Sequence, residues 1–181
     1  TVSDEGNGRY VLLYSDIPYR WEAQWDPPKF DAWIYDLETK TTTPIATALS
    51  GRPSLSAAGN FAYWFDIDKG DWFVYDNQTA VTSNITEAID VNFWNEKNDV
   101  PGKPGPYGIA AWGKDDAYVL INDMFDIWKI DPKIKTEPYT ITHNIGRKDS
   151  ITFRYLNTDK EKRFVEPDET LLLTAFDNKS K

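Results

Sequence analysis

The sequence predicts an all-β fold, a β-propeller fragment of about three four-stranded antiparallel blades plus part of a fourth. A strand that begins and ends with Asp occurs three times, as Asp31–Asp36, Asp71–Asp76 and Asp126–Asp131. Each copy follows a polar turn and an apolar run, and an Ile beside Thr or Ala comes nine or ten residues after it. The copies are 40 and 55 residues apart. A fixed order of strands and turns repeated about every 40–50 residues is typical of propeller blades.

Composition supports stacked sheets and excludes several other classes. Of the 181 residues, 40% are hydrophobic and 15% aromatic, which suits broad sheet faces packed on one another. The formal net charge of −9 and isoelectric point of about 4.6 argue against a nucleic-acid partner. We interpret this charge as solubilising, in preference to an acidic binding surface.

Several kinds of site and segment are missing from the sequence. The chain has no Cys, so disulfides, thiol catalysis and thiolate metal sites are excluded. No run approaches the roughly 20 apolar residues of a membrane-spanning helix, and the N-terminus lacks the pattern of a signal peptide. Glycosylation sequons begin at Asn77, Asn84 and Asn178, and we interpret them as turn residues.

The first blade is expected at about residues 1–50. Thr1–Gly6 is interpreted as the end of an innermost strand with its turn, and the strands Tyr10–Ser15, Asp31–Asp36 and Thr41–Thr47 follow. A long insertion, residues 16–30, contains Trp21, Glu22 and Trp25 as well as Phe30. Long loops on a repeat scaffold are favoured places for binding. The alternative, which we prefer here, is that the aromatic side chains pack the loop onto its own blade.

The second blade is expected at about residues 51–88. A short innermost strand lies within Gly51–Ser56, and the strands Phe61–Phe65, Asp71–Asp76 and Ala80–Thr86 follow. Phe61–Phe65 has no polar alternation, so we expect both of its faces to be covered.

An insertion at residues 89–106 separates the second and third blades. It contains Trp94 and a Pro/Gly run at residues 101–106, whose composition alone is typical of an interdomain linker. The repeat predicts instead that Tyr107–Trp112 is the next innermost strand. We therefore expect the propeller itself to carry this insertion.

The third blade is expected at about residues 107–145 and a partial fourth at about 146–181. Tyr118–Ile121 and Asp126–Asp131 are strands of the third blade. The rest of the chain is interpreted in order as a polar connection, a strand, a charged turn and an apolar strand, at Asn144–Asp149, Ile151–Leu156, Asn157–Lys162 and Glu169–Phe176.

The recurring Asp residues raise the alternative of a calcium site. Asp66, Asp68 and Asp71 have partial calcium-loop spacing but lack the Glu expected at loop position twelve. Asp accepts hydrogen bonds from main-chain N–H groups in tight turns. We therefore predict turn formers and no metal site.

The register makes two further predictions. Trp33, Phe73 and Trp128 occupy the same position in the three copies and are expected to be buried, with a cost of about 3–5 kcal/mol for each change to Ala if burial is complete. The final strand, Thr170–Phe176, has no charge within its apolar part, so we expect an unprotected edge and self-association of the chain.

The aligned blades resemble the propeller of the prolyl oligopeptidase family of serine peptidases, in particular large exported members from Bacteroidetes. Ser56–Gly59 stands where such blades carry Ser-Pro-Asp-Gly. Blade motifs of this kind are shared with the periplasmic propeller of the Tol system. The stretches that resemble the peptidase subgroup are Gly51–Ser56, Asn95–Glu96 with Asp99–Pro101, Pro106–Trp112 and Asp123–Trp128.

This resemblance implies an exported parent, periplasmic or at the cell surface, in which a propeller caps a hydrolase domain with Ser, Asp and His. The chain has no Gly-X-Ser-X-Gly motif, and His143 is its only His. We therefore predict no catalytic residue, cofactor or metal here, and expect the parent's hydrolase domain and its peptide substrate as partners. Dipeptidyl peptidases of this family bind the substrate amino terminus through acidic residues of a propeller insertion, but Glu22 lacks the adjacent Glu of such a pair.

Three functions are left open by the sequence. The first is a noncatalytic scaffold and substrate-size filter of a serine peptidase. The second is a binding module for a peptide, glycan or protein, with a loop surface formed by Trp21, Glu22, Trp25, Trp94 and Tyr107. The third is a plain protein-interaction propeller.

Overall fold

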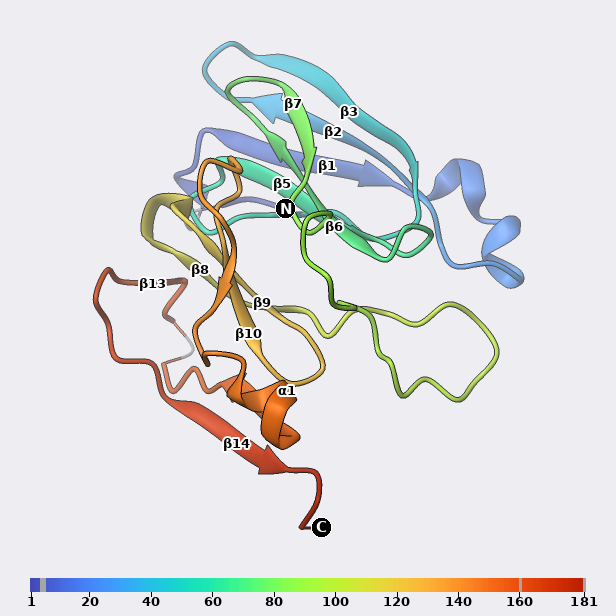
Figure 1. Ribbon diagram of the computed structural model, residues 1–181. Coiled ribbons are helices and arrows are strands. Elements are labelled where there is room, and N and C mark those ends of the chain that lie inside the picture. Colours follow the sequence, from blue (N-terminus) through green and yellow to red (C-terminus); the bar gives the residue numbers. More distant parts are fainter. Residues whose placement is uncertain (4–5, 160, 181) are drawn as a thin grey trace. The chain divides into compact units, whose positions relative to one another are not determined.

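The structure is a computed structural model that describes residues 1–3, 6–159 and 161–180. It divides into two compact units, Thr1–Thr86 and Glu87–Lys181. Both units consist mostly of antiparallel β-sheet, which confirms the predicted all-β class (Figure 1). None of the described helices has the length and apolar character needed to cross a membrane.

The first sheet of the first unit follows the predicted strand order. Its antiparallel strands are β1 (Tyr10–Ser15), β2 (Phe30–Asp36) and β3 (Thr41–Leu49). The innermost strand expected at Thr1–Gly6 is represented by one bridge between Val2 and Val11, and residues 4 and 5 lie outside the described residues. The described part of this sheet therefore has three strands, where we predicted four.

The second sheet is the predicted four-stranded meander. Its strands, in spatial order, are β4 (Ser54–Leu55), β5 (Phe61–Asp66), β6 (Asp71–Asp76) and β7 (Val81–Asn84). Adjacent residues Trp64 and Phe65 of β5 are both buried, and they point to opposite faces. The prediction that β5 is covered on both faces is confirmed.

The two sheets of the first unit share one core. Leu12, Ala32 and Ile34 of the first sheet cluster with Ala62 and Trp64 of the second. Packing of the two sheets against each other removes these apolar side chains from water, and burial of apolar surface is the main favourable term in folding. Consecutive repeats are held together by this shared core, as in other repeat proteins.

The main sheet of the second unit contains the third repeat and one strand that was not predicted. Antiparallel neighbours β8 (Ile109–Gly113), β9 (Val119–Asn122), β10 (Ile127–Ile130) and β11 (Tyr139–Thr140) follow the expected order, with the 3-10 turn η4 (Lys114–Asp116) after β8. The additional strand, β13 (Phe164–Val165), pairs in parallel with the free side of β8 (Figure 1).

The last part of the chain differs from its prediction in two places. The polar connection expected at Asn144–Asp149 contains the one-turn helix α1 (Ile145–Asp149). The strand expected at Glu169–Phe176 begins later, as β14 (Leu173–Asp177), and pairs antiparallel with β12 (Ile151–Tyr155). Part of the charged turn expected at Asn157–Lys162, residue 160, lies outside the described residues.

Burial at the shared register position is weaker than predicted. Trp33, Phe73 and Trp128 are half-buried, so the expectation of buried rings is wrong. The more deeply buried face of each strand belongs to the alternate positions, since Ala32 and Trp72 are fully buried beside them. Side chains along a strand alternate between its two faces, so the three rings lie on the less deeply buried face of their strands.

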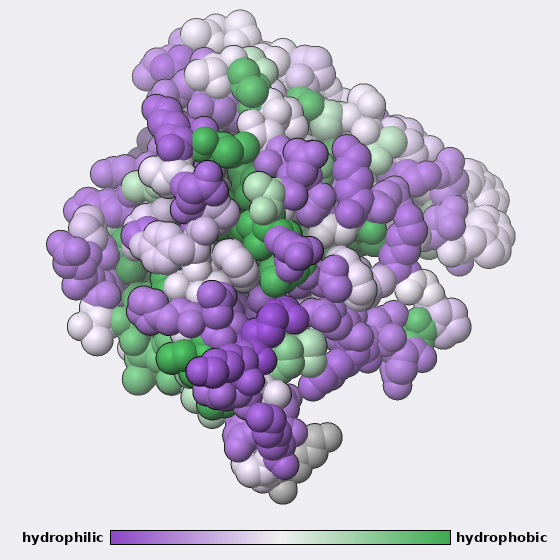
Figure 2. All heavy atoms as spheres, viewed as in Figure 1, coloured by the Kyte–Doolittle hydropathy of each residue, from purple (hydrophilic) through white to green (hydrophobic). Residues whose placement is uncertain are grey.

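Hydrophilic side chains cover most of the face seen in Figure 2, and hydrophobic residues gather there in small patches.

Candidate functional site

The second Asp of each repeated strand forms a turn. The Oδ1 atoms of Asp36 and Asp76 and the Oδ1 atom of Asp131 each accept a hydrogen bond from the main-chain N–H two residues later, at 2.9, 2.8 and 2.8 Å. Such bonds replace the main-chain partners that the strand loses at its end. The prediction that these residues are turn formers is confirmed.

The first Asp of each strand accepts a hydrogen bond from a residue further along the chain. Asp71 accepts a hydrogen bond from the Thr86 hydroxyl at 3.0 Å, and Asp126 accepts one from the Thr142 hydroxyl at 2.5 Å. Asp31 accepts a bond from a main-chain N–H in β3 at 3.1 Å. In all three repeats this carboxylate holds the chain at or just after the strand that follows the Asp-bracketed strand in its own sheet. In the second and third repeats the donor is a Thr that follows the Asp by 15 or 16 residues.

The partial calcium motif also forms a turn. Asp66 Oδ1 accepts hydrogen bonds from the N–H groups of Asp68 and Lys69, at 2.9 and 3.1 Å, and from the Ser50 hydroxyl at 2.9 Å. Within residues 1–3, 6–159 and 161–180, no group of three or more His, Asp or Glu side chains is placed to hold a metal ion.

The first insertion exposes two indole rings. It contains the 3-10 turns η2 (Ile17–Tyr19) and η3 (Glu22–Gln24), which project from the ends of β1 and β2 in Figure 1. Trp21 is 79% exposed and Trp25 is 77% exposed. The interpretation that these rings pack the loop onto its own blade is therefore wrong. It holds for Phe30, which contacts Tyr14 edge-to-face at 5.8 Å between ring centroids.

Polar contacts hold this exposed loop in place. The Tyr19 hydroxyl donates a hydrogen bond to Asp31 at 2.5 Å, and this bond raises the pKa of Tyr19. Lys29 Nζ pairs with Glu22 at 2.9 Å, so the Glu22 carboxylate already has a cationic partner. The contacts engage the polar side chains of the loop and leave the two Trp rings in water.

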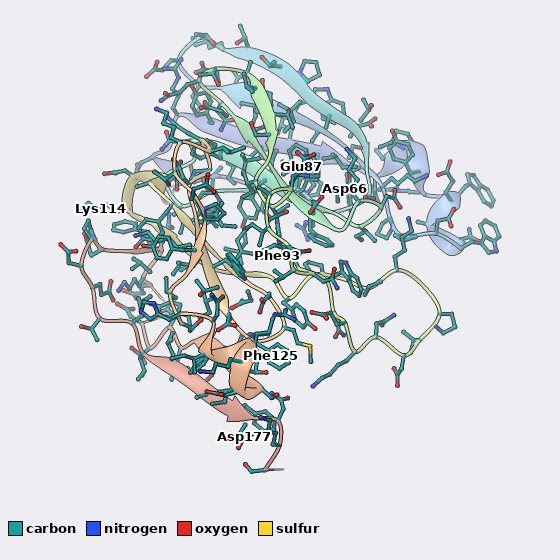
Figure 3. All side chains as sticks on the ribbon, viewed as in Figure 1. Asp66, Glu87, Phe93, Lys114, Phe125 and Asp177 are labelled. Carbon is teal, nitrogen blue, oxygen red and sulfur yellow. The ribbon has the colours of Figure 1, made fainter. Side chains whose placement is uncertain are left out.

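The second insertion is closed by its own main chain. The Asn95 N–H donates to Gly105 O and the Tyr107 N–H to Phe93 O, both at 2.9 Å. Phe93 is 1% exposed and contacts Trp128 of β10 edge-to-face at 6.4 Å (Figure 3). The insertion is thus anchored on the sheet of the second unit, as the repeat predicts, and is not a free linker.

Trp94 and Tyr107 are half-buried in this insertion and serve its structure. Trp94 forms an isolated antiparallel β-bridge with Pro106, and the Tyr107 hydroxyl accepts a hydrogen bond from the Glu96 N–H at 2.9 Å. Burial raises the pKa of Tyr107, and the Arg154 guanidinium lies over its ring at 5.4 Å. Of the five predicted surface residues, the structure places Trp21, Glu22 and Trp25 on one loop of the first unit and the other two in the second unit.

A buried carboxylate in the second unit was missed by sequence reasoning. Asp123 is 1% exposed and accepts bonds from the Trp128 indole and the Arg147 guanidinium, both at 3.2 Å. Arg147 of α1 also reaches Glu96 at 3.5 Å, and its guanidinium lies over the ring of Phe125, the residue labelled near α1 in Figure 3. This network ties the β9–β10 turn to α1 and to the second insertion. The spacing of Asp123 from Asp126 identifies a turn but not these distant partners.

His143 lies exposed in a turn with a φ of +53°. Among the described residues, no side-chain hydrogen bond or ion pair connects His143 with a Ser hydroxyl or a carboxylate, as a catalytic base would require. Comparison with protein-family models finds no match, and no curated protein matches the chain.

Proposed function

We propose that the chain is a noncatalytic β-propeller segment of a larger serine peptidase that resembles the prolyl oligopeptidase family. The observation that carries this proposal is the repeated Asp bond, which in three sheets ties the start of the Asp-bracketed strand to the chain in, or just after, the strand that follows it. A repeated internal bond of this kind fits a row of blades, about three complete and a fourth in part. Face-to-face packing of the first two sheets fits the same architecture.

The turn that carries part of the resemblance is built as a blade turn requires. Ser56 Oγ accepts a hydrogen bond from the Phe61 N–H at 3.0 Å, and Gly59 has a φ of +81°. A positive φ of this size favours Gly. These two residues support the assignment of Ser56–Gly59 to the Ser-Pro-Asp-Gly position of peptidase propellers.

In this proposal the segment acts as scaffold and substrate-size filter. The parent's hydrolase domain supplies the nucleophile, and the rigid sheets above it admit short peptides and exclude folded proteins. The purified chain should therefore not hydrolyse a chromogenic dipeptide or ester, because no nucleophile and base are brought together among its described residues. Turnover that disappears in the His143→Ala variant would contradict a noncatalytic role.

The filter itself is tested in the parent enzyme. An engineered disulfide between the terminal blades would lock the propeller of the parent enzyme closed. The oxidised enzyme should then cleave a short chromogenic peptide more slowly than the reduced enzyme, since substrate entry is restricted. The same peptidase should leave a folded protein intact in both states. Equal cleavage of folded and short substrates by the parent would exclude the filter and leave only the scaffold.

A second candidate, a binding module, is favoured by the exposure of Trp21 and Trp25. Exposed indoles at this spacing offer flat stacking surfaces to a glycan or a Pro-rich peptide. Quenching of Trp fluorescence by such a ligand should be lost in the Trp21→Ala, Trp25→Ala double variant and retained after Ile17→Ala, which removes an exposed apolar side chain of the same loop. No change in fluorescence with either ligand class would exclude this function.

A further inference from the structure

The first sheet has an uncharged, mostly apolar face that the described residues leave partly uncovered. Val11 of β1 lies opposite Tyr35 of β2. The next such pair is Leu13 and Trp33. Residues directly opposite each other in an antiparallel pair share one face of the sheet, so these four side chains form a single surface, which we call the open face. Leu13 is 44% exposed, and the other three are half-buried. The core shared with the second sheet is formed by the alternate residues of the same strands.

The equivalent face of the second sheet is covered. Its residues, counted from the first Asp of the Asp-bracketed strand and across the strand pairing, are Ala62, Trp64, Phe73 and Tyr75. All four lie in or against the core shared with the first sheet. Trp64 is 4% exposed, at the position where Leu13 is 44% exposed. Tyr75 is 6% exposed, at a position that is half-buried in the first sheet. The difference arises because a neighbouring sheet packs on this face of the second sheet.

The third repeat provides the same comparison within the second unit. Its equivalent residues are Val119, Ile121, Trp128 and Ile130. Val119 and Ile121 are 0% exposed, and Ile130 is 3% exposed. The same strand positions are therefore buried in two repeats and open to water in the first. An apolar surface that is kept in all three repeats indicates that a partner covers it in the first repeat as well.

The side chains of the open face determine the kind of partner. None of them is charged, and Trp33 and Tyr35 are broad and flat, which favours an apolar partner over a charged peptide. In the first unit the equivalent face packs on small and branched side chains of a sheet, including Ala32 and Ile34. Side chains of two packed sheets interdigitate, so a broad aromatic face requires small or branched residues opposite it. A β-sheet that presents such residues therefore fits the open face.

We propose that the open face binds a further antiparallel β-sheet of the longer parent chain, which packs small and branched side chains on Leu13 and Trp33. The packing is that of the first two sheets, in which Ala32 lies against the aromatic face of the second sheet. This inference rests on the repeat architecture of the proposed function and names the partner of its first blade. It does not depend on whether the parent is a peptidase.

Thiol labelling tests whether the open face is covered in the parent. The chain has no Cys, so Leu13→Cys gives the isolated chain a single thiol. A maleimide should label this thiol at least about tenfold more slowly in the folded parent than in the isolated chain, because a covered site reacts only after local opening. Peptide mass spectrometry assigns the label to this position. Equal labelling rates in the two proteins would overturn the proposal.

Leu37→Cys is the matched control. Leu37 is 46% exposed, which is close to the value for Leu13, but it lies in the turn after β2 and outside the open face. Its thiol should be labelled at the same rate in the parent and in the isolated chain. Slower labelling at both positions would mean that the parent covers the first unit in general, and would overturn the assignment of a sheet to the open face.

A charge at the same position gives a second measurement. Leu13→Glu should lower the Tm of the isolated chain by less than about 2 °C, since the side chain is open to water there. It should lower the Tm of the parent by about 5 °C or more, since the charge is then buried under the partner sheet. Equal shifts of Tm in the two proteins would contradict a covered face.

A second copy of the chain is the competing occupant. It would slow the labelling of Leu13→Cys as the concentration of the isolated chain rises, even when Ala175→Lys adds a charge to the exposed strand β14 and blocks pairing there. That result would replace the proposed sheet by a self-contact and overturn the proposal. Peptidase activity enters none of these measurements, so a parent without it refutes the proposed function and leaves this interface standing.

Discussion

At the scale of single residues, Asp126 is the most deeply buried of the repeated Asp side chains. It is 1% exposed and accepts hydrogen bonds from Thr142 Oγ1 at 2.5 Å and from the N–H groups of Gly146 and Arg147, both at 2.9 Å. Asp126→Ala leaves these donors without their acceptor. We expect the free energy of unfolding to fall by about 3 kcal/mol, measured by urea denaturation.

Asp131 provides the matched control at the other end of the same strand. It is only half-buried and its carboxylate holds a turn at the surface. Asp131→Ala should cost about 1 kcal/mol, since water replaces part of the lost hydrogen bonding. Equal losses of unfolding free energy in the two variants would show that burial does not determine how much each carboxylate contributes to stability.

The Arg9–Asp36 pair predicts a pH dependence. Arg9 donates to both carboxylate oxygens, at 3.0 and 2.7 Å, and this bonding holds the pKa of Asp36 well below its usual value of 3.8. A lowered pKa in the folded state stabilises the fold above the unfolded pKa and loses this effect as pH falls. The difference in Tm between the wild type and Asp36→Asn should therefore be full above about pH 5 and shrink steadily below about pH 4.

The Asn variant isolates the charge in that experiment. Its Oδ1 atom can still accept the bonds from Glu38 and Thr39 that form the turn. A Tm difference that stays constant from pH 7 to pH 2 would mean that the ion pair with Arg9 does not stabilise the first unit.

At the scale of elements, the two faces of a strand are covered to different degrees. In β6, Trp72 is 6% exposed, whereas Phe73 is half-buried and stacks on Trp64 with 5.9 Å between ring centroids. We expect Trp72→Ala to lower the free energy of unfolding by about 4 kcal/mol and Phe73→Ala by about 2 kcal/mol, measured by urea denaturation. A larger loss for Phe73→Ala than for Trp72→Ala would contradict this ranking of the two faces.

At the scale of the whole molecule, the edge of β14 predicts self-association. Among the described strands β14 pairs only with β12, and Phe176 on it is 57% exposed. The only charge on β14 is that of Asp177 at its last position, and an edge whose other residues, Leu173–Phe176, are uncharged can pair with a second copy. Light scattering coupled to size-exclusion chromatography should therefore show a dimer whose fraction increases with protein concentration.

A charge on this edge should prevent the pairing. Ala175 is exposed on β14, and Ala175→Lys places a charge on the strand as natural edge strands do. The variant should elute as a monomer at concentrations at which the wild type is dimeric. A wild type that is monomeric throughout, or a variant that still dimerises, would rule out association through β14.

The sequence by itself determined the order of the strands and the position of most of them. Asp71–Asp76 and Tyr10–Ser15 coincide with their predicted ranges. The signals for these elements are local, since strand patterns have a period of two and an Asp turn needs only the next two or three residues. Turn roles such as that of Asp36 could be predicted for the same reason. The loop that carries Trp21 and Trp25 could also be located from the repeat.

Only the tertiary structure decided which side chains of those elements are buried and what they contact. Tyr107 was predicted on a binding surface but lies under Arg154, and Asp126 was predicted as a turn former but binds the chain up to 21 residues later. The pairing of β13 with β8 joins residues 52 positions apart, such as Phe164 and Trp112. A two-residue strand or a one-turn helix has too little local stability to leave a pattern in the sequence. Such elements form because distant parts of the chain pack against them, and that packing exists only in the folded protein.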